Sequence, residues 1–236
     1  NSIEEILEYK SKLAEEIEQI ENVEEINKKL RIEQKEIESK MNNLCNLMNE
    51  KREKYGIILS EKINNELKDL EMPNACFSIK IEKEASFNIN GNDKIEFAIS
   101  PNIGEESKEL IKIASGGEMS RIMLAIKTVL ADIDEVPILV FDEIDTGISG
   151  KAAKAVAEKM KIISNKHQTL CITHLPAIAA QGKNNFYIYK EVTNGKTRTK
   201  IKKLNEQEII FEIARISNGD ITDVAIENAK ELRKAV

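Results

Sequence analysis

The chain has 236 residues, of which 32% are charged and 4% aromatic, and its net charge at neutral pH is −6. This length suffices for one core-bearing domain with an extension, or for two small domains, and the charge-rich, aromatic-poor balance is typical of long exposed helices. The acidic balance excludes a generally basic nucleic-acid binder, so any contact with DNA must come from a local patch or from another part of the protein.

The cysteines and the hydropathy exclude further classes. Cys45, Cys76 and Cys171 are odd in number and widely spaced, which disfavours a disulfide framework or a zinc site and indicates reduced thiols. No apolar run approaches the roughly 20 residues of a membrane span, and the acidic N-terminal stretch is unlike a signal peptide. We therefore expect a soluble, cytoplasmic protein without a membrane partner.

Residues 1–70 contain no proline and a single glycine, and they carry a helical pattern. Apolar residues recur every three or four positions from Ile3 to Met48, with a slip near Val23 and Ile26. This spacing, with charged flanks, predicts a coiled-coil arm of about 100 Å, whose partner helix must lie on another chain or in another part of the protein. The alternative is an amphipathic helix lying on its own domain. We assign the arm to 1–70 and a second domain to 71–236.

A small antiparallel sheet is expected after the arm. Pro73 ends the helical pattern. Alternating runs at 77–81, 87–89 and 95–99 predict half-buried strands joined by a hairpin turn at 90–93. Residues 104–114 are expected to form a loop.

A parallel βαβ unit is expected next. The period at 119–130 predicts a helix, and the apolar run 138–141 predicts a strand that is buried on both faces. A helix at 151–164 and a second apolar strand at 170–173 complete the unit, which should be right-handed. Its functional loops then lie at the carboxyl ends of the strands.

The C-terminal third predicts a hairpin and two helices. Runs at 186–189 and 197–204 flank Asn194-Gly195, a strong hairpin signal, and helical patterns cover 206–216 and 222 to the end.

Ser115-Gly116-Gly117 directly precedes the first of these helices after the sheet. Glycines let backbone N–H groups approach an anion at the positive end of a helix, so the Ser115 hydroxyl and the Gly117 N–H are candidates to hold a γ-phosphate. Taken alone, the motif is also an ordinary helix cap and turn.

Two strand ends supply the other candidates. Asp142 and Glu143 follow the first apolar strand, where Asp142 would hold Mg²⁺ and Glu143 would polarise an attacking water. His174 ends the second strand and would hydrogen-bond the γ-phosphate or that water. Taken alone, each residue could have no catalytic role: the carboxylates could simply be solvated at a strand end, and the histidine could make a structural hydrogen bond. Their shared order and spacing favours function.

In this order the motifs resemble the signature, Walker B, D-loop and switch-histidine elements of an ABC-type ATPase. Five longer segments are similar to the RecN family of SMC-like bacterial DNA-repair ATPases, namely 72–77, 99–105, 113–125, 140–150 and 172–176. The resemblance covers roughly residues 70–236. It implies an α/β fold: the C-terminal lobe of an ABC/SMC-type P-loop ATPase head with a parallel βαβ core, flanking antiparallel hairpins and an N-terminal coiled-coil arm.

The resemblance also implies how the site is used. Two heads of a homodimer would sandwich two ATP molecules with Mg²⁺, and the assembly would engage DNA at the nucleoid in recombinational repair of double-strand breaks. Asp142, Glu143 and His174 would serve ATP held in cis. Asp145 would be a further nucleotide-binding residue, within a D-loop along the dimer interface. The residues that would contact ATP on the opposite protomer are Ser115, Gly116, Gly117 and Glu118.

One element of such a head does not occur in the sequence. There is no Gly-x-x-x-x-Gly-Lys-[Ser/Thr] motif, and therefore no phosphate-cradling P-loop. We expect an N-terminal P-loop lobe of the same protein as a partner, and we expect this chain alone to bind ATP weakly and to be inactive as an ATPase.

Two other functions are considered, and one surface is left open. An ABC transporter ATPase subunit shares the motif order but would not carry a heptad arm directly before its signature lobe. A structural coiled-coil module with vestigial ATPase residues is the other alternative. The stretch 186–204 is the most basic in the chain, and its lysines either contact DNA phosphates or guard an exposed strand edge.

Overall fold

The computed structural model describes residues 2–102, 104–112, 116–193 and 196–234. Contacts divide the chain into two compact units. The first comprises the residues up to Tyr55 together with Ile81–Ile95, and the second comprises Gly56–Lys80 together with the chain from Glu96 onward. The domain boundary at residue 70 remains a prediction, since the long helix contributes to both units.

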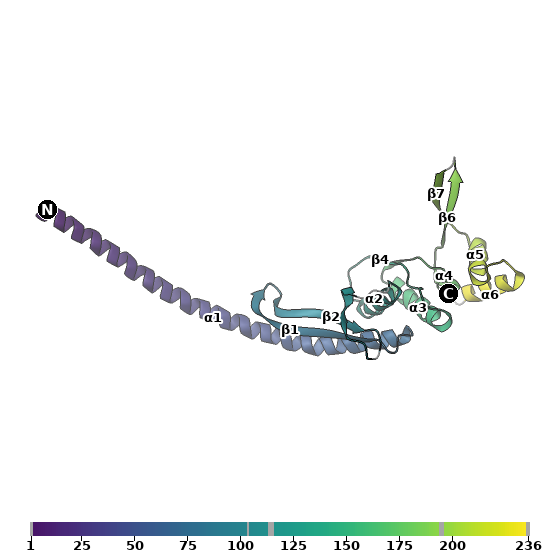
Figure 1. Cartoon of the computed structure of the whole chain (residues 1–236), viewed down its shortest axis with the longest axis horizontal. Helices are drawn as coiled ribbons and strands as arrows, with labels where there is room; N and C mark the ends of the chain where they lie inside the picture. The colour runs from purple at the N-terminus through teal and green to yellow at the C-terminus, as the bar shows by residue number, and fades with distance from the viewer. Residues whose placement is uncertain (1, 103, 113–115, 194–195, 235–236) are drawn as a thin grey trace. The chain divides into compact units, whose positions relative to one another are not determined.

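The described chain contains both helices and strands (Figure 1). In chain order the elements are α1 (Ile3–Asp69), β1 (Cys76–Asn88), β2 (Gly91–Ser100), β3 (Lys108–Glu109), the 3₁₀ helix η1 (Leu110–Lys112), α2 (Gly116–Leu130), β4 (Ile138–Phe141), α3 (Gly150–Ser164), β5 (Gln168–Cys171), α4 (Pro176–Gln181), β6 (Phe186–Thr193), β7 (Lys196–Lys203), α5 (Glu206–Asn218) and α6 (Asp223–Lys234).

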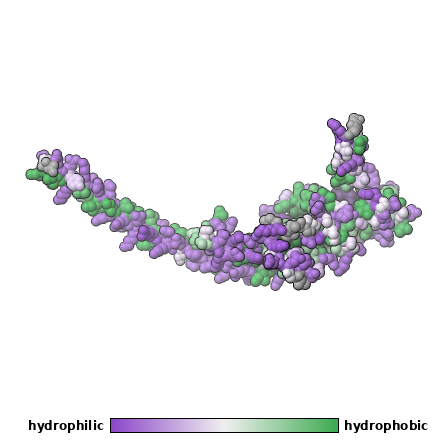
Figure 2. Space-filling model, viewed as in Figure 1, coloured by the Kyte–Doolittle hydropathy of each residue, from purple (hydrophilic) through white to green (hydrophobic). Residues whose placement is uncertain are grey.

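α1 is one continuous helix of 67 residues. At 1.5 Å per residue it is about 100 Å long. The predicted helix is therefore confirmed, and it continues through the slip near Val23. Most of its heptad positions are exposed, as the green patches along the helix show (Figure 2). The exposed apolar residues include Ile3, Ile6, Leu13, Ile17, Ile20, Leu30 and Ile37. No helix in the described ranges is both long and apolar enough to cross a membrane.

In the first unit, polar contacts fasten the β1–β2 turn to α1. The buried Asp93 carboxylate accepts hydrogen bonds from Asn49 Nδ2 at 2.9 Å and from Arg52 Nη1 at 2.8 Å. Arg52 also donates to the Asn90 carbonyl at 2.7 Å. Because a buried carboxylate must be paired, these three side chains fix the register of the turn on the helix.

The second unit contains the predicted βαβ arrangement. β4 and β5 pair in parallel, with Ile138 opposite Gln168 and Phe141 opposite Cys171, and α3 connects them. Most of the core is formed by the C-terminal part of α1, the base of the β1–β2 sheet, α2, β4 and α3. Its buried members include Ile63, Leu67, Phe77, Ile99, Ile122, Leu124, Leu139, Phe141, Val156 and Ile163. A second cluster joins α4, α5 and α6 through small and β-branched side chains such as Ala180, Ile213 and Ala225.

Hydrogen bonds also dock the sheet and α3 onto the end of α1. Asn64 exchanges two hydrogen bonds with the backbone of Phe77, at 2.9 and 2.7 Å. Lys159 of α3 lies 2.8 Å from carboxylate oxygens of both Glu66 and Asp69. Burial lowers the pKa of Lys159, but its hydrogen bonds to Asp69 and Glu66 outweigh this effect and the pKa ends above its ordinary value.

Several sequence-based expectations need correction. The residues 104–114 are not all loop, because β3 pairs with β2 and η1 follows it. The short helix α4 was not predicted, although Pro176 at its first turn is a common start signal. The two strands expected at 77–81 and 87–89 form one strand, β1. The predicted Asn194-Gly195 turn lies outside the described residues, but the antiparallel β6–β7 pair that it would join is confirmed.

The largest correction concerns the strand 138–141, which was expected to be buried on both faces. Leu139 and Phe141 are buried, whereas Ile138 and Val140 are 49% and 65% exposed. On the neighbouring strand end, Leu170 and Ile172 are also about half exposed. Within the described residues, one face of the two-stranded sheet is therefore largely exposed, whereas Leu139 and Phe141 on the other face join the core together with residues of α2 and α3.

Candidate functional site

The carboxyl ends of β4 and β5 lie side by side, as the sequence predicted. Asp142 and Glu143 follow β4 directly, and His174 follows β5 after two further residues. The backbone pairing continues one step past the strands, since Ile172 N–H donates to the Phe141 carbonyl at 3.0 Å. The two strand ends therefore bring both carboxylates and the imidazole to one edge of the second unit.

Glu143 has an unusual backbone conformation. Its φ is +57°, in the left-handed region that non-glycine residues adopt at a cost of about 1–3 kcal/mol. Its N–H donates to Asp142 Oδ1 at 2.9 Å, and its carbonyl accepts from Thr146 N–H at 3.1 Å. These bonds form a tight turn that leaves both the Asp142 and Glu143 side chains exposed.

The N-terminus of α2 packs against this turn. A methyl group on Gly116 would collide with Glu143 Oε2, and a methyl group on Gly117 would lie 2.9 Å from the Thr146 carbonyl oxygen and 3.1 Å from the Glu143 carbonyl oxygen. At Gly117 the neighbours are backbone atoms, so only glycine permits this approach, whereas at Gly116 the flexible Glu143 side chain would have to move. The structure therefore brings both glycines next to the Asp142–Glu143 loop. Glu118 lies in the same helical turn and is partly buried. Ser115 lies outside the described residues.

Two further side chains of α2 hold the same loop. Ser120 Oγ donates to the Asp142 carbonyl at 2.8 Å. The buried Arg121 guanidinium donates to the Thr146 carbonyl at 2.9 Å and to the Ile144 carbonyl at 3.4 Å. Burial lowers the pKa of Arg121 and the charge of Glu118 raises it, and an arginine stays protonated at neutral pH. A buried cation thus satisfies loop carbonyls that would otherwise lack donors.

Asp145 connects the two strand ends. Its side chain is 3% exposed, and its Oδ2 accepts from Thr173 Oγ1 at 2.6 Å and from the His174 N–H at 2.7 Å. His174 Nδ1 lies 3.1 Å from the same oxygen, while 72% of the imidazole side chain is exposed. Thr173 Oγ1 in turn accepts from Leu175 N–H at 3.0 Å. One buried carboxylate therefore organises the segment that carries His174.

Burial and the negative charges at this edge affect the pKa of the Cys171 thiol. Burial, together with the negative charges of Asp145 and Asp142, raises the pKa of the Cys171 thiol to about 12. The thiol is therefore protonated at neutral pH and is not a nucleophile. The same concentration of negative charge favours a cation at the exposed Asp142.

Asp142 meets the requirements for Mg²⁺ only with help from a ligand. No group of three or more histidine, cysteine, aspartate or glutamate side chains within the described ranges is arranged to hold a metal ion. Mg²⁺, however, is commonly bound through one or two carboxylates plus phosphate oxygens and water. A single exposed carboxylate beside glycine N–H groups fits a Mg·nucleotide better than a free ion.

Sequence reasoning missed three positioning residues, Ser120, Arg121 and Thr173. Ser120 and Arg121 stand four positions after Gly116 and Gly117, so they share helix faces with the two glycines. That spacing was a signal that they, too, could reach the loop after β4. Thr173 gave no signal beyond standing next to His174.

The β6–β7 hairpin is a second candidate surface. The register pairs Tyr187 with Lys202 and Tyr189 with Lys200, so these tyrosines share a face with the basic residues of β7. The two tyrosine rings stack with centroids 5.7 Å apart. The side chains on that face are Tyr187, Tyr189, Glu191, Thr193, Lys196, Arg198, Lys200 and Lys202. The opposite face carries the exposed apolar residues Phe186, Ile188, Val192 and Ile201 together with Lys190, Thr197, Thr199 and Lys203.

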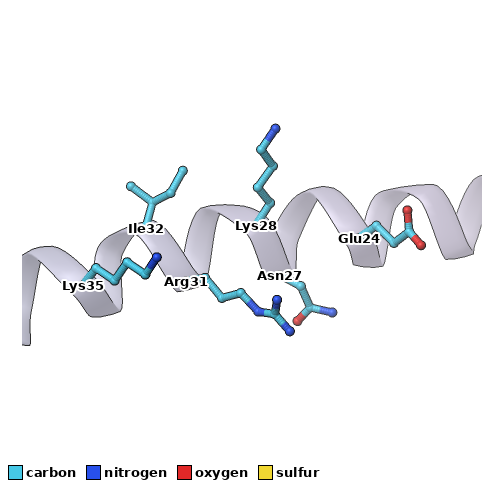
Figure 3. Close-up of a pocket in the computed structure, with 6 residues that line it drawn as sticks. All are labelled: Glu24, Asn27, Lys28, Arg31, Ile32 and Lys35. Atoms are coloured by element: carbon cyan, nitrogen blue, oxygen red, sulfur yellow. The ribbon is translucent and has the colours of Figure 1, made fainter.

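One hollow of about 470 Å³ lies along α1 (Figure 3). Its lining residues are Glu24, Asn27, Lys28, Arg31, Ile32 and Lys35. All six belong to a single helix and none of the catalytic candidates is among them. The hollow is the uneven surface of an exposed helix, not a binding site.

The chain was compared with known protein families, curated proteins and solved structures. No protein-family model matches the chain. It is 40% identical to the DNA repair protein RecN of Bacillus subtilis (strain 168) over 99% of this chain and 43% of that protein. The RecN protein of Halalkalibacterium halodurans is 37% identical over 98% of this chain and 42% of its own length. The chain thus spans less than half the length of these relatives.

Among solved structures, the Smc head domain of Pyrococcus yayanosii with a coiled coil and joint has a TM-score of 0.47 and 22% identity. The match covers 86% of this chain and 38% of that one. A second Smc head, from Pyrococcus furiosus and bound to the C-terminal domain of ScpA, has a TM-score of 0.45.

Proposed function

Because the chain belongs to the RecN family, we propose that it is the C-terminal lobe of an SMC-like ATPase head, with its returning coiled-coil arm. The observation that carries the proposal is the convergence of the α2 N-terminus, the Asp142–Glu143 turn and His174 on one edge of the βαβ unit. The completed protein would bind and hydrolyse ATP between paired heads and act on DNA in recombinational double-strand-break repair. It would work in the cytoplasm, at the nucleoid.

Each residue at the edge then has a chemical task. Glu143 would orient and polarise the attacking water, and its exposed carboxylate is free to reach one. Asp142 would hold Mg²⁺, which when bound neutralises developing charge on the phosphates. His174 would contact the γ-phosphate or the water through its exposed ring.

The α2 N-terminus would serve a nucleotide held by the opposite head. The N–H groups at Gly116 and Gly117 lie at the positive end of a 15-residue helix and are unobstructed by a side chain of their own. Ser115 and Glu118 would complete this contact. The loop from Asp145 to Gly150 would run along the interface of a head-to-head homodimer.

The uncovered face of β4 and β5 supports a missing lobe. Parallel strands are almost always covered on both faces, yet Val140 and Leu170 are exposed here. The sequence also lacks a P-loop motif. An N-terminal P-loop lobe that packs on this face would cover the strands and supply the phosphate cradle. The exposed heptad positions of α1 similarly fit a second, outgoing helix of the same arm.

The test is ATP hydrolysis by this chain alone and after mixing with a separately produced N-terminal lobe. We expect activity only in the mixture, and a loss of at least about a hundredfold with Glu143→Gln, because that change removes the general base. Glu135→Gln, in the loop before β4, is the matched control and should leave the rate unchanged.

Robust activity of the chain alone would contradict the need for a P-loop lobe. Absence of activity in a mixture that forms a complex and has been supplied with DNA would contradict the ATPase proposal and favour a structural coiled-coil module.

A further inference from the structure

Asp145 lies in a different environment from the one that the family resemblance implies. The resemblance placed it among residues that meet a nucleotide, but its side chain is 3% exposed and its Oδ2 already faces three nitrogen or oxygen donors. A buried carboxylate with these contacts has little surface left for a ligand. Its geometry instead resembles that of a group which acts through a neighbouring side chain.

The neighbouring side chain is His174. Its backbone N–H and its Nδ1 lie 2.7 and 3.1 Å from Asp145 Oδ2. The same carboxylate therefore contacts both the backbone and the ring of His174. The hydroxyl of Thr173 donates a second hydrogen bond to the same oxygen, at 2.6 Å, and keeps the carboxylate in place. In a histidine, the hydrogen bond made by one ring nitrogen decides the protonation of the other.

We propose that Asp145 is a positioning residue that holds His174 by Nδ1–H, so that Nε2 is the nitrogen presented to solvent and to any bound nucleotide. In the neutral ring Nε2 then carries the lone pair and can accept a hydrogen bond from an attacking water. In the charged ring the same nitrogen donates to a phosphate oxygen. Either way, Asp145 fixes the direction from which His174 acts, without touching the ligand itself.

The tautomer can be measured without any ATPase activity. The chain contains only two histidines, His167 and His174, and ¹⁵N chemical shifts of the labelled rings at about pH 8.5 distinguish Nδ1–H from Nε2–H. Substituting His174→Gln assigns the signals. His167 is an internal control for folding. Its side chain is buried, its Nδ1 lies 2.6 Å from the Val136 carbonyl, and it shares no hydrogen-bond partner with Asp145 in the described structure.

We expect His174 of the unmodified chain to be mainly in the Nδ1–H form, and Asp145→Ala to shift it toward Nε2–H while the His167 signals stay in place. An Nε2–H form in the unmodified chain would overturn the proposal. So would an Nδ1–H form that persists in Asp145→Ala with His167 unchanged. If Asp145→Ala fails to fold, Asp145→Ser, whose hydroxyl falls short of the ring, is judged by the same two outcomes.

The kinetic consequence rests on the proposed ATPase function. In the completed head, Asp145→Ala should lower kcat roughly tenfold to a hundredfold, as loss of an orienting partner does elsewhere, with KM for ATP changed less than about twofold. In a His174→Ala background the same substitution should change kcat no further, because Asp145 acts through the ring. Independent losses would contradict the proposal. A wild-type head without activity would instead contradict the proposed function, while the tautomer measurement still decides the role of Asp145.

Discussion

The edge of the β4–β5 sheet and the open face of the same strands are satisfied in opposite ways. At the edge, polar groups find hydrogen-bond partners within the chain. Arg121 donates to the Thr146 carbonyl. The Asp145 carboxylate accepts from Thr173 and from the His174 N–H. On the open face, Val140 and Leu170 are 65% and 49% exposed. The difference teaches that this chain holds the Asp142–Glu143 turn and His174 in place with its own side chains, whereas the other face of the same strands stays exposed within the described residues.

The sharpest test compares two neighbours on β4 that point to opposite faces. Leu139→Ala should lower the free energy of unfolding by about 2–5 kcal/mol, because Leu139 is buried in the core. Val140→Ala should change it by less than about 0.5 kcal/mol in the isolated chain. Urea unfolding followed by circular dichroism measures both.

For binding of the proposed N-terminal lobe, position 140 should matter more than position 139, the reverse of their order for stability. Val140→Lys should then abolish complex formation in a pull-down, since it places a charge in the covered face. Equal stability losses at positions 139 and 140 in the isolated chain would mean that the open face is already packed.

A second substitution tests whether the edge is held from within. Arg121→Met should cost about 2–3 kcal/mol, because the carbonyls of Ile144 and Thr146 lose a charged donor in a buried site. Lys112→Met is the matched control, since Lys112 pairs with Glu109 on the surface and its loss should cost less than about 0.5 kcal/mol. Thermal or urea unfolding gives both values, and a neutral Arg121→Met would show that the loop does not depend on it.

The two glycines of α2 should respond differently to a methyl group. Gly117→Ala meets backbone atoms of Thr146 and Glu143 and should cost about 1–3 kcal/mol. Gly116→Ala meets only the flexible end of the Glu143 side chain and should change stability by less than about 0.5 kcal/mol, yet it should displace the Glu143 carboxylate, the proposed general base. Unfolding experiments compare the stabilities, and ATPase assays of the completed head should show a loss for Gly116→Ala. Equal destabilisation by both changes would contradict this close packing.

The smallest expected effect concerns the hairpin, whose basic face is only partly neutralised. Lys200 pairs with Glu191 and Lys202 with Glu208, whereas within the part of the chain that the structure describes neither Lys196 nor Arg198 forms an ion pair. If the face contacts phosphates in the full-length protein, the double substitution Lys196→Glu and Arg198→Glu should weaken DNA binding more than Lys200→Glu with Lys202→Glu. It should also reduce the salt dependence of log Kd by about 0.9 per lost duplex contact.

Fluorescence anisotropy at several salt concentrations measures both quantities. Unchanged DNA affinity in both double variants would leave the lysines as guards of an exposed strand edge.

Much of the candidate site was predictable because it depends on local pattern. A glycine pair before a helical period, and polar residues directly after apolar runs, identify the α2 N-terminus, Asp142, Glu143 and His174. The convergence of the last three followed from one topological rule, since neighbouring parallel strands end at the same edge. The structure confirmed that juxtaposition, while the catalytic roles remain proposals.

The remaining features depend on contacts between segments that are distant in sequence. That Arg121 reaches the carbonyls of Ile144 and Thr146, and that Asp145 is buried under Thr173 and His174, depends on how α2 and β5 pack around one loop. The sequence also could not show that Val140 is exposed, because an apolar run reads the same whether or not a second layer covers it.

The sequence by itself determined the long helix, the βαβ order and the residue types at the strand ends, since periodicity and strand polarity are properties of neighbouring residues. Only the tertiary structure decided which carboxylate meets solvent and which is buried: Glu143 projects from a left-handed turn, and Asp145, two residues later, points inward to hold His174. Both are acidic residues in one loop. Their different environments arise because a tight turn sends nearby side chains in opposite directions.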